Sequence, residues 1–318
     1  MKTPLLSRAF LALTLTFLAA PPKGRANDLL VAVFSGDAVA RYDGTSGALV
    51  GTFASHATMD GPTAMVYGAD GNLYVLNEFS HNVLRFNGTT GAFIDEFISS
   101  ATLASAGVGD PGDMELGPDG NLYISAHFPT FSPPFTAVWK FSGTTANDFI
   151  APFASFGAAH HTHGLSFGPG GALFLGDIAV GGMQRFSAVT GTSLGPLALT
   201  APGPLFADLT FTPDGKLYAT VDGGGGVLSY DGFTTSALIA PGAFGSYWGI
   251  YADGGFLYAG NKDTGTIKKF TDTGVFVSDF IAVAGAPFDI ISMPTPEPGT
   301  GALVLAGLAG LVLRRTRK

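Results

Sequence analysis

The feature that most constrains this chain is a turn followed by a short aromatic strand, which recurs along its length. The clearest copies are DGNLYV at 70–75, DGNLYI at 119–124 and DGKLYA at 214–219, and weaker copies are GGALF at 170–174 and DGGFLY at 253–258. Measured between the aromatic residues Tyr74, Tyr123, Phe174, Tyr218 and Tyr258, the intervals are 49, 51, 44 and 40 residues. A period of this length is typical of repeats built from four β-strands.

A second motif supports the repeat and gives its number. It consists of an apolar residue, any residue, usually a basic residue and then an aromatic residue. Its six copies are VARY at 39–42, VLRF at 83–86, VWKF at 138–141, MQRF at 183–186, VLSY at 227–230 and IKKF at 267–270. The alternation of apolar and polar positions indicates strands that bury one face.

One complete unit is predicted to contain strand a at 62–67, an Asp-Gly turn, strand b at 73–78, strand c at 82–86, an Asn-Gly-Thr-Thr-Gly turn and strand d at 93–98. The first strand after the N-terminal region, at 28–34, is a strand b, and the unmatched strand a lies at 287–292. We therefore expect an all-β, six-bladed β-propeller over residues 27–293, closed by a C-terminal strand that completes blade one. The 46 glycines and 27 phenylalanines of the 318-residue chain favour short aromatic strands joined by tight turns.

The pattern Pro-x-Asp-apolar, then Pro-Asp-Gly-x-Leu-Tyr, then Arg-Phe resembles the NHL and six-bladed propeller superfamily over nearly all of residues 28–293. Lactonases, sugar dehydrogenases, antibiotic lyases and pure binding domains share such an architecture. The resemblance implies the fold and leaves the function open, because none of the catalytic sets of these enzymes maps fully onto this chain.

The N-terminus is predicted to be a secretory signal peptide over residues 1–26, which would form a signal helix. Lys2 and Arg8 precede an apolar run at 9–20, and small residues at Gly24 and Ala26 suit a cleavage site. A run of twelve apolar residues is short for a membrane span, which needs about 20.

The C-terminal residues 294–318 contain three parts in a fixed order: Pro296, Glu297 and Pro298, an apolar stretch at 301–313, and a basic end that includes Arg314 and Arg315. This arrangement resembles the PEP-CTERM sorting signal with its short hydrophobic sorting helix. The resemblance implies export through the secretion machinery of a Gram-negative bacterium and recognition by an exosortase. It also implies transient contact of the tail with the inner membrane, then release or attachment at the cell surface, often with exopolysaccharide. A surface protein is considered as a further partner of the propeller.

Charge and composition exclude several classes of function. With the eight basic residues of the two ends and Glu297 set aside, the body keeps eight basic and 23 acidic residues, a net charge of about −15. A charge of this sign argues against nucleic acid as a partner. Cysteine is absent, which excludes disulfides, thiolate metal sites and a cysteine nucleophile.

Two groups of residues are candidate metal ligands at the channel mouth, with zinc or calcium as the divalent cation. His160, His161 and His163 make up half of the six histidines, and imidazoles on one extended segment suit transition metals. The alternative is a polar loop whose histidines bond nearby carbonyls. Alignment of the strand a copies also predicts a ring of carboxylates, made of Asp113, Asp208 and Asp289, alternating with Ala64, Gly164 and Gly249.

Such a ring could hold calcium, or each aspartate could bond backbone N–H groups of the neighbouring blade.

Aromatic residues supply a candidate ligand surface. The proline-rich insertion at 127–135 carries Phe128, Phe131 and Phe135, and Trp248 lies in the strand a of blade six. These rings could form an apolar or sugar-stacking platform; the alternatives are a simple lid and a core tryptophan.

The sequence therefore predicts a non-enzymatic binding or scaffold module of the cell surface or extracellular matrix. The alternative is a metal-dependent lyase or hydrolase that acts at the channel mouth.

Overall fold

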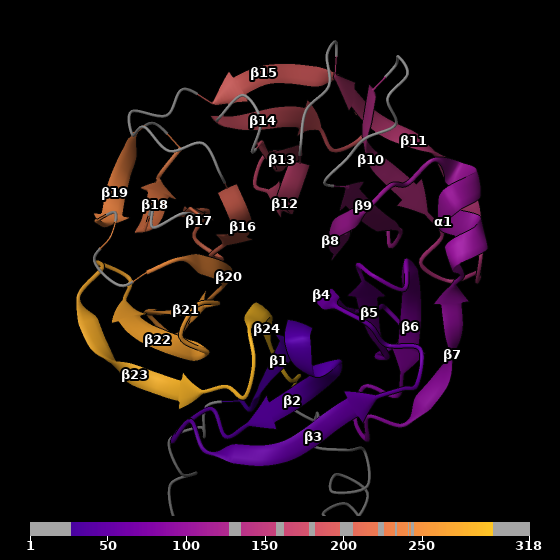
Figure 1. Ribbon diagram of the computed structural model, residues 1–318. Coiled ribbons are helices and arrows are strands. Elements are labelled where there is room, and N and C mark those ends of the chain that lie inside the picture. Colours follow the sequence, from indigo (N-terminus) through magenta and orange to yellow (C-terminus); the bar gives the residue numbers. More distant parts are fainter. Residues whose placement is uncertain are drawn as a thin grey trace, which may run out of the picture.

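A computed structural model describes residues 27–126, 135–156, 162–177, 182–197, 206–221, 226–232, 234–240, 242 and 245–294. These residues form six four-stranded antiparallel sheets arranged as blades around a central channel (Figure 1). Each sheet begins with an inner strand at the channel and ends with an outer strand at the rim. The predicted all-β six-bladed propeller is confirmed.

Each blade runs from the channel outward through four strands. Blade one contains β24 (Pro287–Ser292), β1 (Leu29–Val33), β2 (Ala38–Tyr42) and β3 (Leu49–Ser55); blade two contains β4 (Pro62–Tyr67), β5 (Leu73–Asn77), β6 (Asn82–Phe86) and β7 (Phe93–Ile98); blade three contains β8 (Pro111–Leu116), β9 (Leu122–Ala126), β10 (Phe135–Phe141) and β11 (Phe149–Phe156).

Blade four contains β12 (Thr162–Gly168), β13 (Ala172–Asp177), β14 (Gly182–Ser187) and β15 (Ser193–Leu197); blade five contains β16 (Phe206–Phe211), β17 (Leu217–Val221), β18 (Gly226–Tyr230) and β19 (Thr235–Ile239); blade six contains β20 (Tyr247–Asp253), β21 (Phe256–Asn261), β22 (Thr266–Thr271) and β23 (Phe276–Ala282).

The last strand of the chain closes the ring. β24 pairs antiparallel with β1, so that Ile290 lies opposite Val31 and Ser292 lies opposite Leu29. In Figure 1 the yellow β24 lies beside the indigo β1 in one blade. This confirms that the first blade is completed from the other end of the sequence.

The two sequence motifs of the repeat are cross-strand partners. Tyr74 on β5 lies opposite Arg85 on β6, and the Tyr74 hydroxyl donates a hydrogen bond of 3.1 Å to Asp70 in the preceding turn. The Arg85 guanidinium lies over the Tyr74 ring and pairs with Asp95 on β7. Gly68 begins the turn because a Cβ atom there would approach the Tyr74 ring to 2.5 Å. The repeated sequence motifs are therefore the residues through which one turn packs against two strands.

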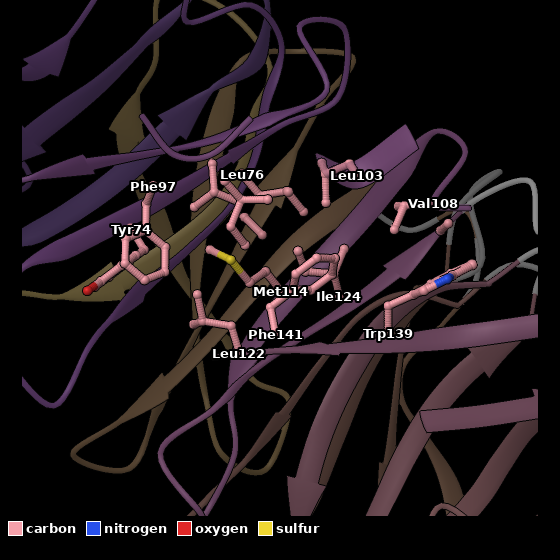
Figure 2. Packing of buried hydrophobic residues seen from close by; sticks show 14 residues of the cluster. Tyr74, Leu76, Phe97, Leu103, Val108, Met114, Leu122, Ile124, Trp139 and Phe141 are labelled. Carbon is pink, nitrogen blue, oxygen red and sulfur yellow. The ribbon is translucent and has the colours of Figure 1, made fainter. Parts of the chain in front are cut away.

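The core lies between adjacent blades, where the faces of two sheets meet. Figure 2 shows this packing between blades two and three, where Tyr74, Phe97, Met114 and Phe141 belong to one buried cluster. Burial of such side chains contributes roughly 1.5–3 kcal/mol each. The same pattern around the ring joins the six sheets into one body.

One short helix was not expected from the sequence. α1 (Ser100–Ala106) lies between β7 and β8, with Ser99 as its N-cap and Gly107 in a left-handed conformation at its end. Trp139 packs beside it and donates a hydrogen bond of 3.0 Å to the carbonyl of Ala106. The Ser cap and the terminal glycine were visible in the sequence as helix signals.

The predicted signal and sorting helices lie outside the described residues. Within the part of the chain that the structure describes, no helix has the length and apolar character needed to cross a membrane.

Candidate functional site

The inner strands place the three predicted aspartates at equivalent positions around the channel. Asp113, Asp208 and Asp289 are each the third residue of β8, β16 and β24. Each carboxylate accepts one hydrogen bond from the backbone N–H of the following residue and a second from the next blade. The bonds between blades run from Leu165 to Asp113 at 2.7 Å, from Ile250 to Asp208 at 2.7 Å and from Met65 to Asp289 at 2.6 Å.

In the three blades between the aspartates, the same position of the inner strand carries a small residue. Ala64, Gly164 and Gly249 are the third residues of β4, β12 and β20, and each precedes the N–H group that an aspartate accepts. A Cβ atom at Gly249 would lie 2.8 Å from the carbonyl oxygen of Phe288 on β24. Close approach of neighbouring inner strands therefore favours a small residue in every second blade.

The electrostatics of this ring favour protonated carboxyl groups. Loss of hydration raises the pKa of Asp113 to about 8, aided by the charge of Asp289 and opposed by the hydrogen bond from Leu165. Burial likewise raises the pKa of Asp289 to about 7, and that of Asp208 well above its usual value with the charges of Asp113 and Asp289 adding to the effect. No such shift could be assigned from the spacing of these residues in the sequence.

Both oxygens of each ring aspartate are thus engaged by backbone N–H groups. Among the described residues, no three His, Cys, Asp or Glu side chains gather in a group that could hold a metal ion. The arrangement joins blade three to four, five to six and one to two. The sequence left two interpretations of these aspartates, a calcium site and bonds to backbone N–H groups of the neighbouring blade. The hydrogen bonds in the structure are of the second kind.

At the end of the channel where the inner strands begin, which we call the mouth, aromatic rings form a continuous row. Trp248 on β20 contacts Phe288 on β24 at 4.2 Å between centroids, Phe288 stacks on Phe34 at 4.0 Å, and Phe34 meets Phe79 edge to face at 5.0 Å. At the other end of the row, the His163 ring meets Trp248 edge to face at 4.6 Å. We call these five residues the aromatic row.

The aromatic row crosses blades four, six, one and two, and its end at Phe79 is open to solvent, with 60% of that residue exposed. The carboxyl group of Glu78 lies beside Phe79 in the sequence, and Asp110, immediately before β8 of blade three, lies near enough to Glu78 to affect its pKa. Burial and then the charge of Asp110 raise the pKa of Glu78 to about 7, and Asp110 contacts the His81 ring at 3.3 Å. An exposed ring with carboxyl groups nearby can bind a ligand that has both apolar and hydroxyl faces.

The structure gives a partial account of the other predicted site residues. His163 is 5% exposed, and its carbonyl accepts a hydrogen bond of 2.5 Å from Ser125. Trp248 lies at the mouth, as its position in strand a suggested. The remaining candidates lie outside the described residues: His160, His161, Phe128, Phe131 and the side chain of Phe135, together with Pro296, Glu297, Pro298, Arg314 and Arg315.

Sequence reasoning missed Phe34, Phe79 and Phe288 of the aromatic row, which come from distant parts of the chain. Phe34 and Phe79 both follow a strand b, and that shared position in the repeat was the available signal. Glu115 was also missed. It follows Asp113 by two residues on β8 and therefore faces the channel too.

The channel also contains a cavity of about 320 Å³, which we call the channel chamber. Its lining begins at the ring of aspartates and continues along each inner strand away from the mouth. Aromatic side chains line its far part: Tyr67, Phe167, Phe211 and Tyr251. The chamber therefore lies toward the turns that join strands a and b, and the aromatic row lies at the opposite end.

Comparisons with known proteins define the fold alone. No protein-family model and no curated protein sequence matches the chain. A chain of the nidogen/laminin complex has a TM-score of 0.64 and 13% identity, covering 84% of this chain and 98% of its own. A Bacteroides caccae protein of unknown function has a TM-score of 0.61 and 13% identity, with 85% and 100% covered. The gluconolactonase XC5397 of Xanthomonas campestris has a TM-score of 0.52 and 16% identity, with 73% and 78% covered. The chain is a six-bladed β-propeller of a kind found in both binding proteins and enzymes.

Proposed function

We propose that this protein is an exported binding module of the cell surface or extracellular matrix, with its binding site at the mouth of the propeller. The observation that carries the proposal is the aromatic row, which ends in the exposed ring of Phe79. Of the five rings, that of Phe79 is exposed, those of Phe34 and Trp248 are half-buried, and those of Phe288 and His163 are buried, so Phe79 is the ring that a ligand would contact first. A scaffold role also agrees with the use of the ring aspartates to join blades.

The ligand class that suits this site is a glycan, for which an exopolysaccharide is the first candidate. The apolar faces of sugar rings pack against aromatic side chains, while their hydroxyl groups donate hydrogen bonds to carboxylates. Glu78 and Asp110 supply such carboxyl groups near Phe79. A surface protein is the other partner that the sequence suggests.

Export is the second part of the proposal and rests on the two ends of the sequence. Residues 1–26 would direct secretion, and residues 294–318 would be recognised by an exosortase after transient contact with the inner membrane. Mass spectrometry of the protein recovered from the cell surface would test this. Loss of both ends is expected, and an intact cytoplasmic chain would contradict it.

The alternative function is a metal-dependent lyase or hydrolase at the same mouth. It rests on His160, His161 and His163, of which the structure describes His163 beside Trp248. The likeness to a gluconolactonase extends to the fold, at 16% identity. A hydrolytic activity that is lost on chelation would favour this alternative over the binding module.

Binding is tested by affinity electrophoresis of the full chain in gels that contain dextran, alginate or soluble cellulose derivatives. Phe79→Ala is expected to abolish retardation by the polysaccharide that binds. Phe276→Ala removes another exposed ring, on the outer strand β23 and far from the mouth, and should leave retardation unchanged. Equal retardation of the wild type and Phe79→Ala would reject the aromatic row as the site.

Intrinsic fluorescence gives a second measurement. The chain has two tryptophans, and Trp139 is buried beside α1 while Trp248 belongs to the aromatic row. Ligand binding at the mouth is expected to change the emission of Trp248, and a Trp248→Phe variant should lose that change.

A further inference from the structure

The channel chamber is separate from the mouth and is not used by the proposed function. At about 320 Å³ it falls within the range of small-molecule pockets, which is roughly 300–1,000 Å³. All six inner strands contribute to its wall. A closed ring of rigid strands is a suitable frame for a preformed binding site.

Within the described part of the channel, the carboxyl groups of the chamber have no basic side chain opposite them. Asp113, Glu115, Asp208 and Asp289 line it, and none of the described residues of its wall is Lys or Arg. The other titratable groups on the wall are the phenols of Tyr67 and Tyr251. The chamber therefore disfavours an anion and favours a cation.

Glu115 differs from the three ring aspartates in its hydrogen bonds. Each aspartate accepts two backbone bonds of 2.6–2.7 Å, whereas the side-chain contact of Glu115 is a long bond of 3.5 Å from the Ser166 hydroxyl. A backbone bond from Phe167 also reaches Glu115. At the level of Glu115 the other inner strands carry Val66, Ser166, Thr210, Tyr251 and Ile291, so this carboxyl group breaks the symmetry of the ring.

The aromatic part of the wall gives a second and independent indication of the ligand. Tyr67, Phe167, Phe211 and Tyr251 are among the residues that line the chamber, and each also packs against a core between blades. The hydroxyl of Tyr67 donates a hydrogen bond of 3.2 Å to the carbonyl of Gly88. Aromatic faces attract organic ammonium groups and also pack against their hydrocarbon chains. A divalent metal ion is less suited to such a wall, because it prefers oxygen and nitrogen ligands.

We propose that the channel chamber binds a small organic cation of the alkylammonium class, with its ammonium group at Glu115 and its hydrocarbon part against the aromatic residues of the wall. The described residues offer no set of three metal-capable side chains, which disfavours a bare metal ion. Hydrogen bonds from an ammonium to Glu115 replace the water that a carboxylate loses on burial.

Isothermal titration calorimetry of the full chain with 1,4-diaminobutane tests the proposal. The diamine is expected to bind, while 1,4-butanediol, of the same length and without charge, should not. Glu115→Gln is expected to weaken binding roughly 10- to 100-fold, because a bond to a charged group is lost. Asp253→Asn removes an exposed carboxylate of the same inner strand as Tyr251 and should change binding less than about 2-fold.

The number of protons that the wild-type protein releases on binding the diamine provides a second test, which does not require Glu115→Gln to fold. Because burial raises the pKa of Glu115 and of the ring aspartates, a bound cation should release protons. The affinity of the wild type for the diamine should therefore rise between pH 6 and 8, with heats that depend on the ionisation enthalpy of the buffer.

Four results would overturn the proposal: no binding of the diamine, equal binding of the diol, binding of calcium chloride without the diamine, or unchanged affinity in a folded Glu115→Gln. Phe79→Ala lies at the other end of the channel and should leave diamine binding intact. Failure of the mouth as a glycan site is therefore distinguishable from failure of the chamber.

Discussion

The backbone of Asp208 on β16 lies so near Gly164 on β12 that a Cβ atom at Gly164 would be 2.7 Å from the Asp208 Cα atom. On the other side of Gly164, the N–H of Leu165 donates to Asp113 of blade three. Gly164 thus allows β12 to lie close to blade five, while the N–H of the next residue, Leu165, is hydrogen-bonded to blade three. The same relation holds at Gly249, where a Cβ atom would be 3.1 Å from the Asp289 Cα atom and the N–H of Ile250 donates to Asp208. At Ala64 the bond from the next N–H to the preceding blade is kept.

Gly164→Ala is expected to destabilise the protein by about 1–3 kcal/mol, because the added methyl group meets backbone atoms of β16 and forces the inner strands apart. Chemical unfolding monitored by circular dichroism would measure the change. The matched variant Ala64→Gly, at the equivalent position of blade two, should cost only about 0.5–1 kcal/mol. Equal effects of the two substitutions would mean that the inner ring is not closely packed at Gly164.

The ring aspartates should make the protein less stable as the pH rises. Their folded-state pKa values lie above the unfolded value, at about 8 for Asp113 and about 7 for Asp289, so the folded state binds more protons than the unfolded state between these values and about pH 4. The free energy of unfolding should fall as the pH increases through this window. Melting curves from pH 5 to 8.5 would show a declining midpoint.

A comparison with Asp289→Asn isolates this effect from other titrations. The amide oxygen can still accept the Met65 N–H, but the side chain no longer titrates, so the decline with pH should be shallower than in the wild type. A parallel decline in both proteins would show that Asp289 titrates normally in the folded state.

Removal of β24 should open the ring. A chain that ends at residue 286 loses the pairing of β24 with β1 and the bond from Asp289 to Met65, leaving the inner edge of blade one unpaired. We expect loss of a cooperative melting transition. A chain that ends at residue 294 keeps both contacts and should melt as the full chain does. A cooperative transition in the shorter chain would contradict closure by β24 as the source of stability.

Metal content separates the binding module from the metal-dependent enzyme. Elemental analysis of the full chain and melting before and after chelation are expected to show no stoichiometric metal and no shift of the midpoint, since the ring aspartates are engaged by backbone groups. Stoichiometric zinc that is lost in a variant with alanine at His160, His161 and His163 would instead support the enzyme. Calcium with a large loss of stability on chelation would support a structural ion at the ring.

The repeat was readable because each of its motifs has a local cause. The Asp-Gly turn, the Tyr of strand b and the basic residue of strand c contact one another within one blade, so their types and spacing recur. The strands predicted at 62–67, 82–86, 93–98 and 287–292 have these same bounds in the structure. Helix α1 lies between blades two and three and is not part of the repeat, so the period does not predict it. Its local signals are the Ser cap and the terminal glycine.

The sequence by itself determined the fold class, the six units and the closing strand, because hydrophobic alternation and turn chemistry act over a few residues. It also placed three aspartates at one level of the channel. Tertiary structure alone decided what those carboxylates bond, since their partners lie on the next blade, about 40 to 220 residues away. It likewise assembled the aromatic row and the channel chamber from blades that are remote in the chain. Such sites depend on distances across a closed ring, and no local pattern encodes them.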